Sequence, residues 1–224
     1  MSEHEPVLLP ELVSMLAPEP GQTAVDLTFG GGGHARAVAE LIGPEGTLIG
    51  IDRDPAAEER FNRFAATAHC RTLFISSDFA AGLRALQGEG IRPDMVYVDL
   101  GMSSMQVDAF ERGFSYSYDA PLDMRMDTRQ KFTAADLVNE WPESRIAKVL
   151  RRFGEERYAG GIAREIVRRR PLRTTGDLVA AAKAGMPASA RFGAGHPAKK
   201  RPEEGDRQDT GDSRNESNGK KSSP

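Results

Sequence analysis

The chain has little of what secreted or membrane proteins require. It holds one cysteine, Cys70, so no disulfide can form within it. No apolar run approaches the ~20 residues that a membrane-spanning helix needs. Residues 1–20 contain acids and prolines but no basic segment followed by an apolar run, so they do not form a secretory signal. These absences predict a cytoplasmic protein without membrane contact.

The chain also lacks a charge excess of one sign. Its 30 Lys and Arg stand against 33 Asp and Glu, a net charge of −3, so global basicity does not indicate a nucleic-acid binder. Hydrophobic residues make up 39% of the chain, which suffices for a core. The mean hydropathy of −0.48 nevertheless requires that some part be very polar. The 224 residues allow one domain of ordinary size or two small ones.

Residues 24–54 carry the strongest local pattern. An apolar run at 24–29 leads into four glycines, Gly30–Gly33, then a helical pattern ending near Ile42 and a second apolar run, 47–51, that ends on Asp52. A strand, a glycine turn, a helix and a strand with an acid roughly 20 residues past the glycines are typical of a nucleotide-binding βαβ unit. The alternative is that the glycines only make a tight turn.

The type of nucleotide follows from what this loop lacks. His34 stands where a third glycine of a dinucleotide fingerprint would fall, and no Gly-Lys-Ser/Thr follows to cradle phosphates. A nucleoside without phosphates therefore fits better, and S-adenosylmethionine is the common one.

Further alternation predicts the fold class. Strands are expected at 71–75 and 94–100 and helices at 7–16, 55–66 and 79–86, which gives a doubly wound α/β sheet. Asp52, Asp78 and Asp99 each follow a strand, and ligands bind at the carboxyl ends of such strands. Any one of these acids could be a helix cap. Together they predict a crevice in which Asp78 and Phe79 serve an adenine and Asp99 lies near the reactive end.

The second half of the chain shows no alternation of strands and helices. Residues 108–127 are irregular, with Phe114, Tyr116 and Tyr118 able either to stack on a base or to pack the loop, and with an expected Asp123–Arg125 contact. Helical patterns follow at 133–141, 144–153, 157–170 and 175–184. They carry a cluster of cations that could bind RNA phosphates or pair with Glu155, Glu156 and Glu165: Arg145, Lys148, Arg151, Arg152, Arg157, Arg164, Arg168, Arg169, Arg170 and Arg173.

Seven blocks in order resemble one family, the bacterial 16S ribosomal RNA (cytosine-N4)-methyltransferases, which use S-adenosylmethionine. The blocks are Phe29–His34, Ile51–Pro55, Asp99–Gln106, Arg112–Ser115, Pro121–Asp127, Gly154–Arg157 and Gly195–Lys199. The resemblance implies methyl transfer to N4 of a cytidine in 16S rRNA of the small ribosomal subunit. It also implies cofactor contacts at Gly32, Gly33, His34, Asp52, Phe79, Asp99 and Gln106. Asp99 is the candidate catalytic residue, since it or the backbone carbonyls of Leu100 and Gly101 would accept hydrogen bonds from the target amino group, and no metal is expected.

The resemblance also implies a domain plan. Residues 1–107 would form the N-terminal part of a Rossmann-like class I methyltransferase sheet, and 108–198 a loop and inserted all-α domain for RNA recognition. Residues 199–224 have no aliphatic or aromatic side chain larger than alanine and are expected to be disordered. The family returns to its sheet after the block that ends at Lys199, whereas this chain departs after Lys200. The hypothesis is a truncation or a frame change that leaves the sheet incomplete.

Two other functions remain open at this point. One is an inactive RNA-binding remnant, with its basic helices intact and its sheet incomplete. The other is an NAD-dependent oxidoreductase, against which stand the absence of a hydride-transfer base and the series Asp78, Phe79 and Asp99.

Overall fold

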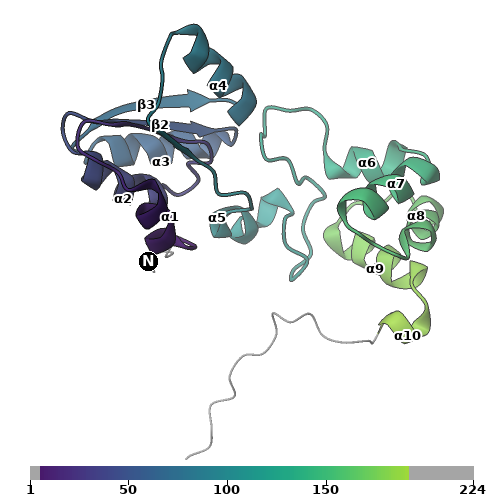
Figure 1. Cartoon of the computed structure of the whole chain (residues 1–224). Helices are drawn as coiled ribbons and strands as arrows, with labels where there is room; N and C mark the ends of the chain where they lie inside the picture. The colour runs from purple at the N-terminus through teal and green to yellow at the C-terminus, as the bar shows by residue number, and fades with distance from the viewer. Residues whose placement is uncertain (1–5, 192–224) are drawn as a thin grey trace, which may run out of the picture. The chain divides into compact units, whose positions relative to one another are not determined.

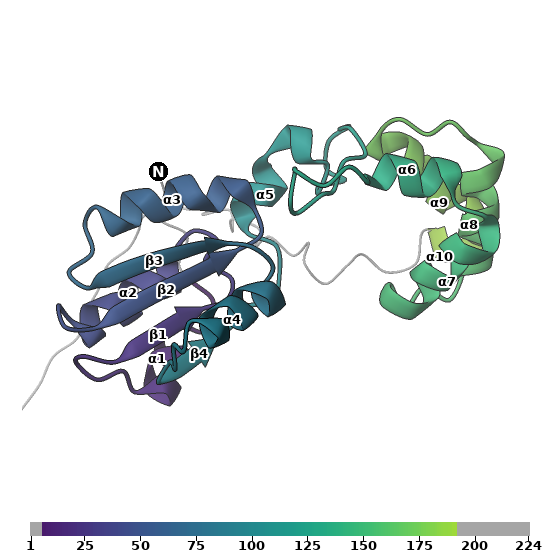
Figure 2. The same ribbon diagram turned by 90° about the horizontal axis from the view of Figure 1, so that it is seen from above.

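The computed structural model describes residues 6–191. Its centre is a parallel sheet (Figure 1), whose four strands lie in the order β3-β2-β1-β4 (Figure 2). The strands are β1 (Thr23–Asp26), β2 (Thr47–Asp52), β3 (Arg71–Ser76) and β4 (Met95–Tyr97). β1 pairs with both β2 and β4, with Ala24 opposite Leu48 on one side and Met95 on the other. The predicted parallel α/β sheet is confirmed.

Helices cover both faces of this sheet. α1 (Leu9–Leu16), α2 (Gly33–Ile42) and α3 (Pro55–Ala65) pack on one face, and α4 (Phe79–Gly88) packs on the other (Figure 1). The first face buries a core built from α2, α3 and the inward residues of the strands, including Val38, Ile42 and Phe61. The second buries Leu86 of α4 against Val25, Ile49 and Ile51. All these elements lie within a few residues of their predicted bounds.

β4 is shorter than predicted. The apolar run at 94–100 was expected to be a strand throughout, but only Met95–Tyr97 pairs. Its neighbour β1 ends at Asp26, opposite Tyr97, and then turns into the glycine loop, so the chain beyond Tyr97 has no strand beside it. No described residue pairs with the outer side of β4, where Val96 and Val98 are 43% and 45% exposed. The pattern of apolar residues could not show where the neighbouring strand would end.

The second half contains no strand among its described residues. α5 (Ser104–Asp108) and the 3-10 helix η1 (Phe110–Arg112) lead through a loop to α6 (Ala134–Glu140), α7 (Glu143–Phe153), α8 (Ala159–Arg168) and α9 (Thr175–Gly185) (Figure 2). The predicted helical segment is confirmed. It has its own apolar core: Leu122, Val138, Ile146, Ile162, Ala163, Ile166, Leu172 and Ala181.

Local sequence explains where these helices begin and how two of them cross. Thr133 and Thr174 each cap a helix, with Asp136 and Asp177 completing the capping boxes. α8 and α9 approach so closely that a Cβ on Gly161 would lie 2.3 Å from the carbonyl oxygen of Gly185. Only glycine fits this contact.

Residues through Pro187 form one compact unit, and α10 (Ala188–Arg191) follows it. The expected polar tail at 199–224 and the Gly195–Lys199 block lie outside the described residues. Among residues 6–191, no helix has the length and apolar character to cross a membrane.

Candidate cofactor site at the carboxyl ends of the strands

The glycine loop rests on an aromatic platform. Gly32 has φ +78°, and a Cβ there would lie 2.6 Å from the ring of Phe29. Phe29 packs edge-on against Phe61 at 5.0 Å between ring centroids, and Phe64 and Phe74 complete the cluster. Both the left-handed backbone and the close ring therefore require glycine at position 32.

Two charged side chains hold Gly30 from opposite sides of its peptide units. The Gly30 N–H donates to Oδ2 of Asp52 at 2.8 Å, and Nε of Arg60 donates to the Gly30 carbonyl at 2.7 Å. The other carboxylate oxygen of Asp52 accepts the Asp54 N–H at 2.9 Å. Each oxygen keeps a second lone pair, so Asp52 can still accept hydrogen bonds from ribose hydroxyls.

Asp26, at the end of β1, is an acid that the sequence did not single out. Its side chain is buried, and burial is the main cause that raises the pKa of Asp26 to about 7, with smaller contributions from the charges of Asp52 and Asp99. The Thr28 N–H donates to Asp26 at 3.0 Å, which opposes the rise. The hydroxyl of Tyr97 lies beside Asp26, and burial raises its pKa as well. Three strand ends thus bring their carboxylates within electrostatic reach of one another.

Asp99 and Phe79 present exposed side chains, as a ligand site requires. The Asp99 N–H donates to Oγ1 of Thr28 at 2.8 Å, which ties the end of β4 to the start of the glycine loop. Phe79 is 47% exposed at the start of α4. Asp78 caps that helix, accepting the Ala81 N–H at 2.9 Å. Its role as a cap, one of the two alternatives for such an acid, is therefore observed.

Gln106 lies in a buried network that the sequence did not reveal. Its Nε2 donates to Oδ2 of Asp54 at 2.9 Å, and its Oε1 accepts the Ser103 N–H at 3.2 Å. Asp54 also pairs with Arg112 at 3.2 Å, with side chains 2% and 11% exposed. Burial alone would raise the pKa of Asp54, but the hydrogen bonds from Gln106, from the Ala56 N–H and from Arg112 hold it below its usual value.

Arg112 extends this network into the irregular loop. Its Nη2 donates to the carbonyls of Arg125 at 2.8 Å and Met126 at 3.0 Å, while its buried Nε has no partner among the described residues. One guanidinium therefore joins the loop at 108–127 to the helix cap at Asp54, beside Asp52.

The remaining site residues lie where the N-terminal segment meets the glycine loop. Nε2 of His34 donates to the Val7 carbonyl at 3.0 Å. A Cβ on Gly33 would lie 2.3 Å from Pro6, so Gly33 is covered by this segment. Met105 of α5 covers Gly31, where a Cβ would lie 3.1 Å from its terminal methyl group. Apolar groups thus flank the loop on two sides.

The loop aromatics divide between the two roles considered for them. Tyr118 stacks on Phe110 at 5.3 Å between centroids and donates to the Val107 carbonyl, so it packs the loop. Tyr116 is 74% exposed and remains available to a base. The predicted Asp123–Arg125 contact is confirmed, with Nη2 to Oδ2 at 2.6 Å.

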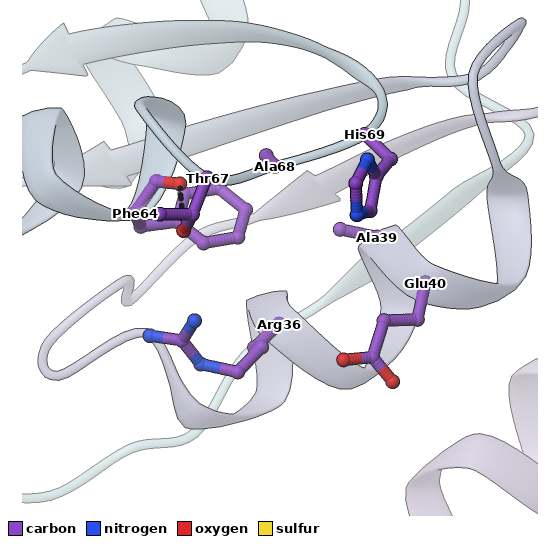
Figure 3. A pocket seen from close by; sticks show the side chains of 7 residues that line it. All are labelled: Arg36, Ala39, Glu40, Phe64, Thr67, Ala68 and His69. Atoms are coloured by element: carbon purple, nitrogen blue, oxygen red, sulfur yellow. Dashed lines mark hydrogen bonds between the residues drawn. The ribbon is translucent and has the colours of Figure 1, made fainter.

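A cavity of about 150 Å³ lies elsewhere, between α2 and the chain that follows α3 (Figure 3). Its lining includes Arg36, Glu40 and His69, with Arg36 over the ring of Phe64 at 5.9 Å. No glycine-loop or strand-end residue lines it. The candidate cofactor site is therefore defined by the converging strand ends and not by this cavity.

Sequence analysis missed four residues of the site: Asp26, Asp54, Arg60 and Arg112. Asp54 precedes Pro55 and reads only as a helix cap, which it also is, accepting the Ala56 N–H at 3.1 Å. Arg60 reads as an ordinary helix cation. The only available signal was that Asp54 and Arg112 both fall in blocks of the resemblance.

The strand order, the glycine loop after β1 and the acid after β2 define a protein with a Rossmann-like α/β fold. Comparison with known proteins gives the family. The sequence profile of the MraW methylase family matches residues 1–201, so the chain belongs to that family.

The names of similar curated proteins agree with this family assignment. The chain is 48% identical over 202 residues to the ribosomal RNA small subunit methyltransferase H of Symbiobacterium thermophilum, and 47% identical over 204 residues to that of Thermobifida fusca. These alignments cover 88% of this chain but 63% and 62% of the relatives, so the chain spans less than two thirds of their length. A solved structure described as a putative rRNA-methylase from Clostridium thermocellum has 21% identity and a TM-score of 0.30, covering 35% of this chain and 44% of its own. That similarity is too slight to bear on function.

Proposed function

We propose that the protein is an S-adenosylmethionine-dependent methyltransferase that acts on N4 of a cytidine in 16S rRNA of the small ribosomal subunit. Its family membership supports methyl transfer to ribosomal RNA. The observation that carries the proposal is the glycine loop clamped beside Asp52, with Asp26 and Asp99 at the neighbouring strand ends.

The charge of this site supports the choice of cofactor. Three carboxylates converge at the strand ends, and the pKa of Asp26 is raised partly by the other two. Such a site disfavours the pyrophosphate of a dinucleotide and suits a ligand that carries an ammonium and a sulfonium charge. Asp52 would accept the ribose hydroxyls, Phe79 would pack on the adenine, and Gly32, Gly33, His34 and Gln106 would line the cofactor. This charge pattern argues against NAD.

In the mechanism, the bound cofactor supplies an electrophilic methyl group. The exposed carboxylate of Asp99 would accept a hydrogen bond from the N4 amino group of the target base, which holds the nitrogen lone pair in line for attack and can take up the proton released. The Leu100 and Gly101 carbonyls could accept the second amino hydrogen. Met105 and Pro6 would exclude water beside the loop. Positioning of this kind supplies a large part of many rate enhancements.

The proposal assigns the two halves of the chain different tasks. Residues 1–107 bind the cofactor, and the loop and helices at 108–198 recognise RNA. The polar tail at 199–224 takes no part, and the protein acts in the cytoplasm.

One observation favours an RNA-binding protein without transfer activity. Val96, Val98 and Leu100 are exposed along and beyond β4, next to Asp99, with Leu100 at 75%. Among the described residues, nothing covers these apolar side chains beside Asp99.

Calorimetric titration of the purified 224-residue chain with S-adenosylmethionine tests the proposal. Binding at micromolar strength is expected, and Asp52→Asn should weaken it, while Glu89→Gln, at the exposed end of α4, serves as control. Absence of heat, from protein shown folded by circular dichroism, would favour the alternative.

Transfer is tested separately with methyl-labelled cofactor and unmethylated small-subunit RNA. Asp99→Ala should abolish incorporation even at cofactor concentrations that saturate the variant. Wild-type turnover in this variant would remove Asp99 from the mechanism.

A further inference from the structure

Eight of the ten cations in the cluster of the helical segment fall into two groups once their partners are known. In and just after α8 the arginines have partners within the segment: Arg168 and Arg169 share the carboxylate of Glu165, at 2.6 Å and 3.0 Å. Arg164 lies 3.9 Å from Glu143. Arg170, just after α8, donates to the Val138 and Trp141 carbonyls and so holds α6 in place. These contacts within the segment account for the presence of these arginines.

The cations of α7 have no such partners. Arg145, Lys148, Arg151 and Arg152 are all exposed, and none forms an ion pair with any acid in residues 6–191. The opposite side of α7 buries Ile146 in the core of the segment.

The spacing along α7 makes this arrangement unfavourable in isolation. Lys148 stands three residues from both Arg145 and Arg151 and four from Arg152, so like charges are neighbours on the helix surface. Like-charge pairs at this spacing destabilise a helix. A negatively charged partner outside the chain would relieve that repulsion.

Aromatic rings lie near both ends of α7. Phe132 stacks on Trp141 at 5.6 Å between centroids with 26° between ring planes, and the guanidinium of Arg145 lies 3.5 Å from the centroid of Trp141. Phe132 is 47% exposed, and at the far end of α7 Phe153 is 74% exposed beside Arg152. Large exposed rings next to unpaired cations fit single-stranded nucleic acid, since cations hold phosphates and rings stack on bases.

We propose that the exposed side of α7, together with the end of this helix at Phe153, is a docking surface for single-stranded RNA. Its cations, Arg145, Lys148, Arg151 and Arg152, would contact successive phosphates, and Phe132 and Phe153 would offer faces for bases. The choice of RNA as the nucleic acid rests on the proposed function, but the surface itself rests on the pairing and exposure of its residues. α8 takes no part in it.

The main test measures binding of a labelled, mixed-sequence single-stranded RNA at several salt concentrations, without cofactor. Lys148→Gln/Arg151→Gln/Arg152→Gln removes three unpaired charges, and Arg164→Gln/Arg168→Gln/Arg169→Gln removes three paired ones. The slope of log affinity against log salt should fall by roughly 2 in the α7 variant, since each phosphate contact contributes about 0.7. The α8 variant should keep the wild-type slope. Equal slopes in the two variants, or no binding by the wild type, would overturn the proposal.

A second variant tests the stacking. Phe153→Leu should weaken binding of single-stranded RNA several-fold and leave binding of heparin, a polyanion without bases, unchanged. Equal losses for both probes, or none, would contradict base stacking and leave a surface that suits any polyanion, such as an acidic protein. Because no cofactor is present, failure of methyl transfer would leave these results intact.

Discussion

The strand-end site and the helical segment use charge in opposite ways. At the strand ends, Asp26 and Asp54 are 2% and 1% exposed, and the side chain of Arg112 is nearly buried with them. In the helical segment the buried side chains are apolar apart from Thr175, and the cations of α7 are exposed. Burying a charge is costly unless the charge is paired. The stability of the strand-end site therefore depends on its charged residues, whereas the stability of the helical segment does not depend on the exposed charges of α7.

This difference predicts how each region responds to substitution. In the strand-end site, removing one charge should change folding and binding together. On the exposed side of α7, removing one charge should change binding alone. The following experiments are ordered by the size of the effect expected on this comparison.

Arg112→Met should be the most damaging change. It leaves the Asp54 carboxylate buried without its cation, and breaking a buried pair in this way costs roughly 3–5 kcal/mol. Urea denaturation followed by circular dichroism measures the loss. Arg129→Met is the matched control, because Arg129 also pairs with an aspartate, Asp127 at 2.8 Å, but is 53% exposed. The control should lose less than about 1 kcal/mol. Similar losses in both variants would show that burial does not distinguish the two pairs.

Asp26→Asn should change how stability depends on pH. The pKa of Asp26 is about 7 in the folded protein and near 3.8 in the unfolded chain. The contribution of Asp26 to stability is therefore most favourable below about pH 4, where Asp26 is protonated in both states. As pH rises towards 7 the unfolded chain ionises first, and wild-type stability falls by up to about 4 kcal/mol. Asn mimics the protonated acid, so the variant should lose less between pH 5 and pH 8 in urea titrations. Parallel curves would mean that Asp26 ionises freely in the folded protein.

Arg60→Met should weaken cofactor binding without a direct contact to the cofactor. Loss of its bond to the Gly30 carbonyl frees the glycine loop, and a hydrogen bond to a charged group is worth about 1.5–3 kcal/mol, so affinity should fall about tenfold or more. Arg63→Met, one turn away and 64% exposed, should leave affinity unchanged. Titration calorimetry compares them, and a Lys at position 60 should restore part of the loss.

Arg151→Gln should have the smallest effect on folding. Its side chain is exposed and has no acidic partner in the described part of the chain, so the free energy of unfolding should change by less than about 0.5 kcal/mol. Reduced like-charge repulsion should slightly offset any loss, and thermal denaturation measures the net change. A large loss would mean that α7 uses this charge internally, against the proposed separation.

Much of the fold could be predicted because its signals are local. The glycine turn, the apolar runs and the helical patterns each act over a few residues, and the elements they predict are present. The strand predicted at 94–100 was too long because β4 ends where its neighbour β1 ends, at Asp26. Asp26 lies far away in sequence, so the local pattern could not show this end.

The site was predictable only in part, for the same reason. Asp52 could be predicted from its distance to the glycines along the sequence. Asp54 and Arg112 are separated by 58 residues, and nothing in either neighbourhood shows that they meet. Arg60 has the appearance of any exposed helix cation until the loop carbonyl beside it is seen. Contacts between distant segments are set by the packed fold and are invisible to local pattern.

The crossing of α8 and α9 has a consequence for how this protein can vary over generations. Gly161 and Gly185 touch through backbone atoms, and every codon change that alters either residue adds a Cβ where there is no room. A substitution at either position cannot be tolerated until a second one compensates for it. Inherited variation in this segment should therefore accumulate on the outer surface of the helices, while the crossing itself stays fixed.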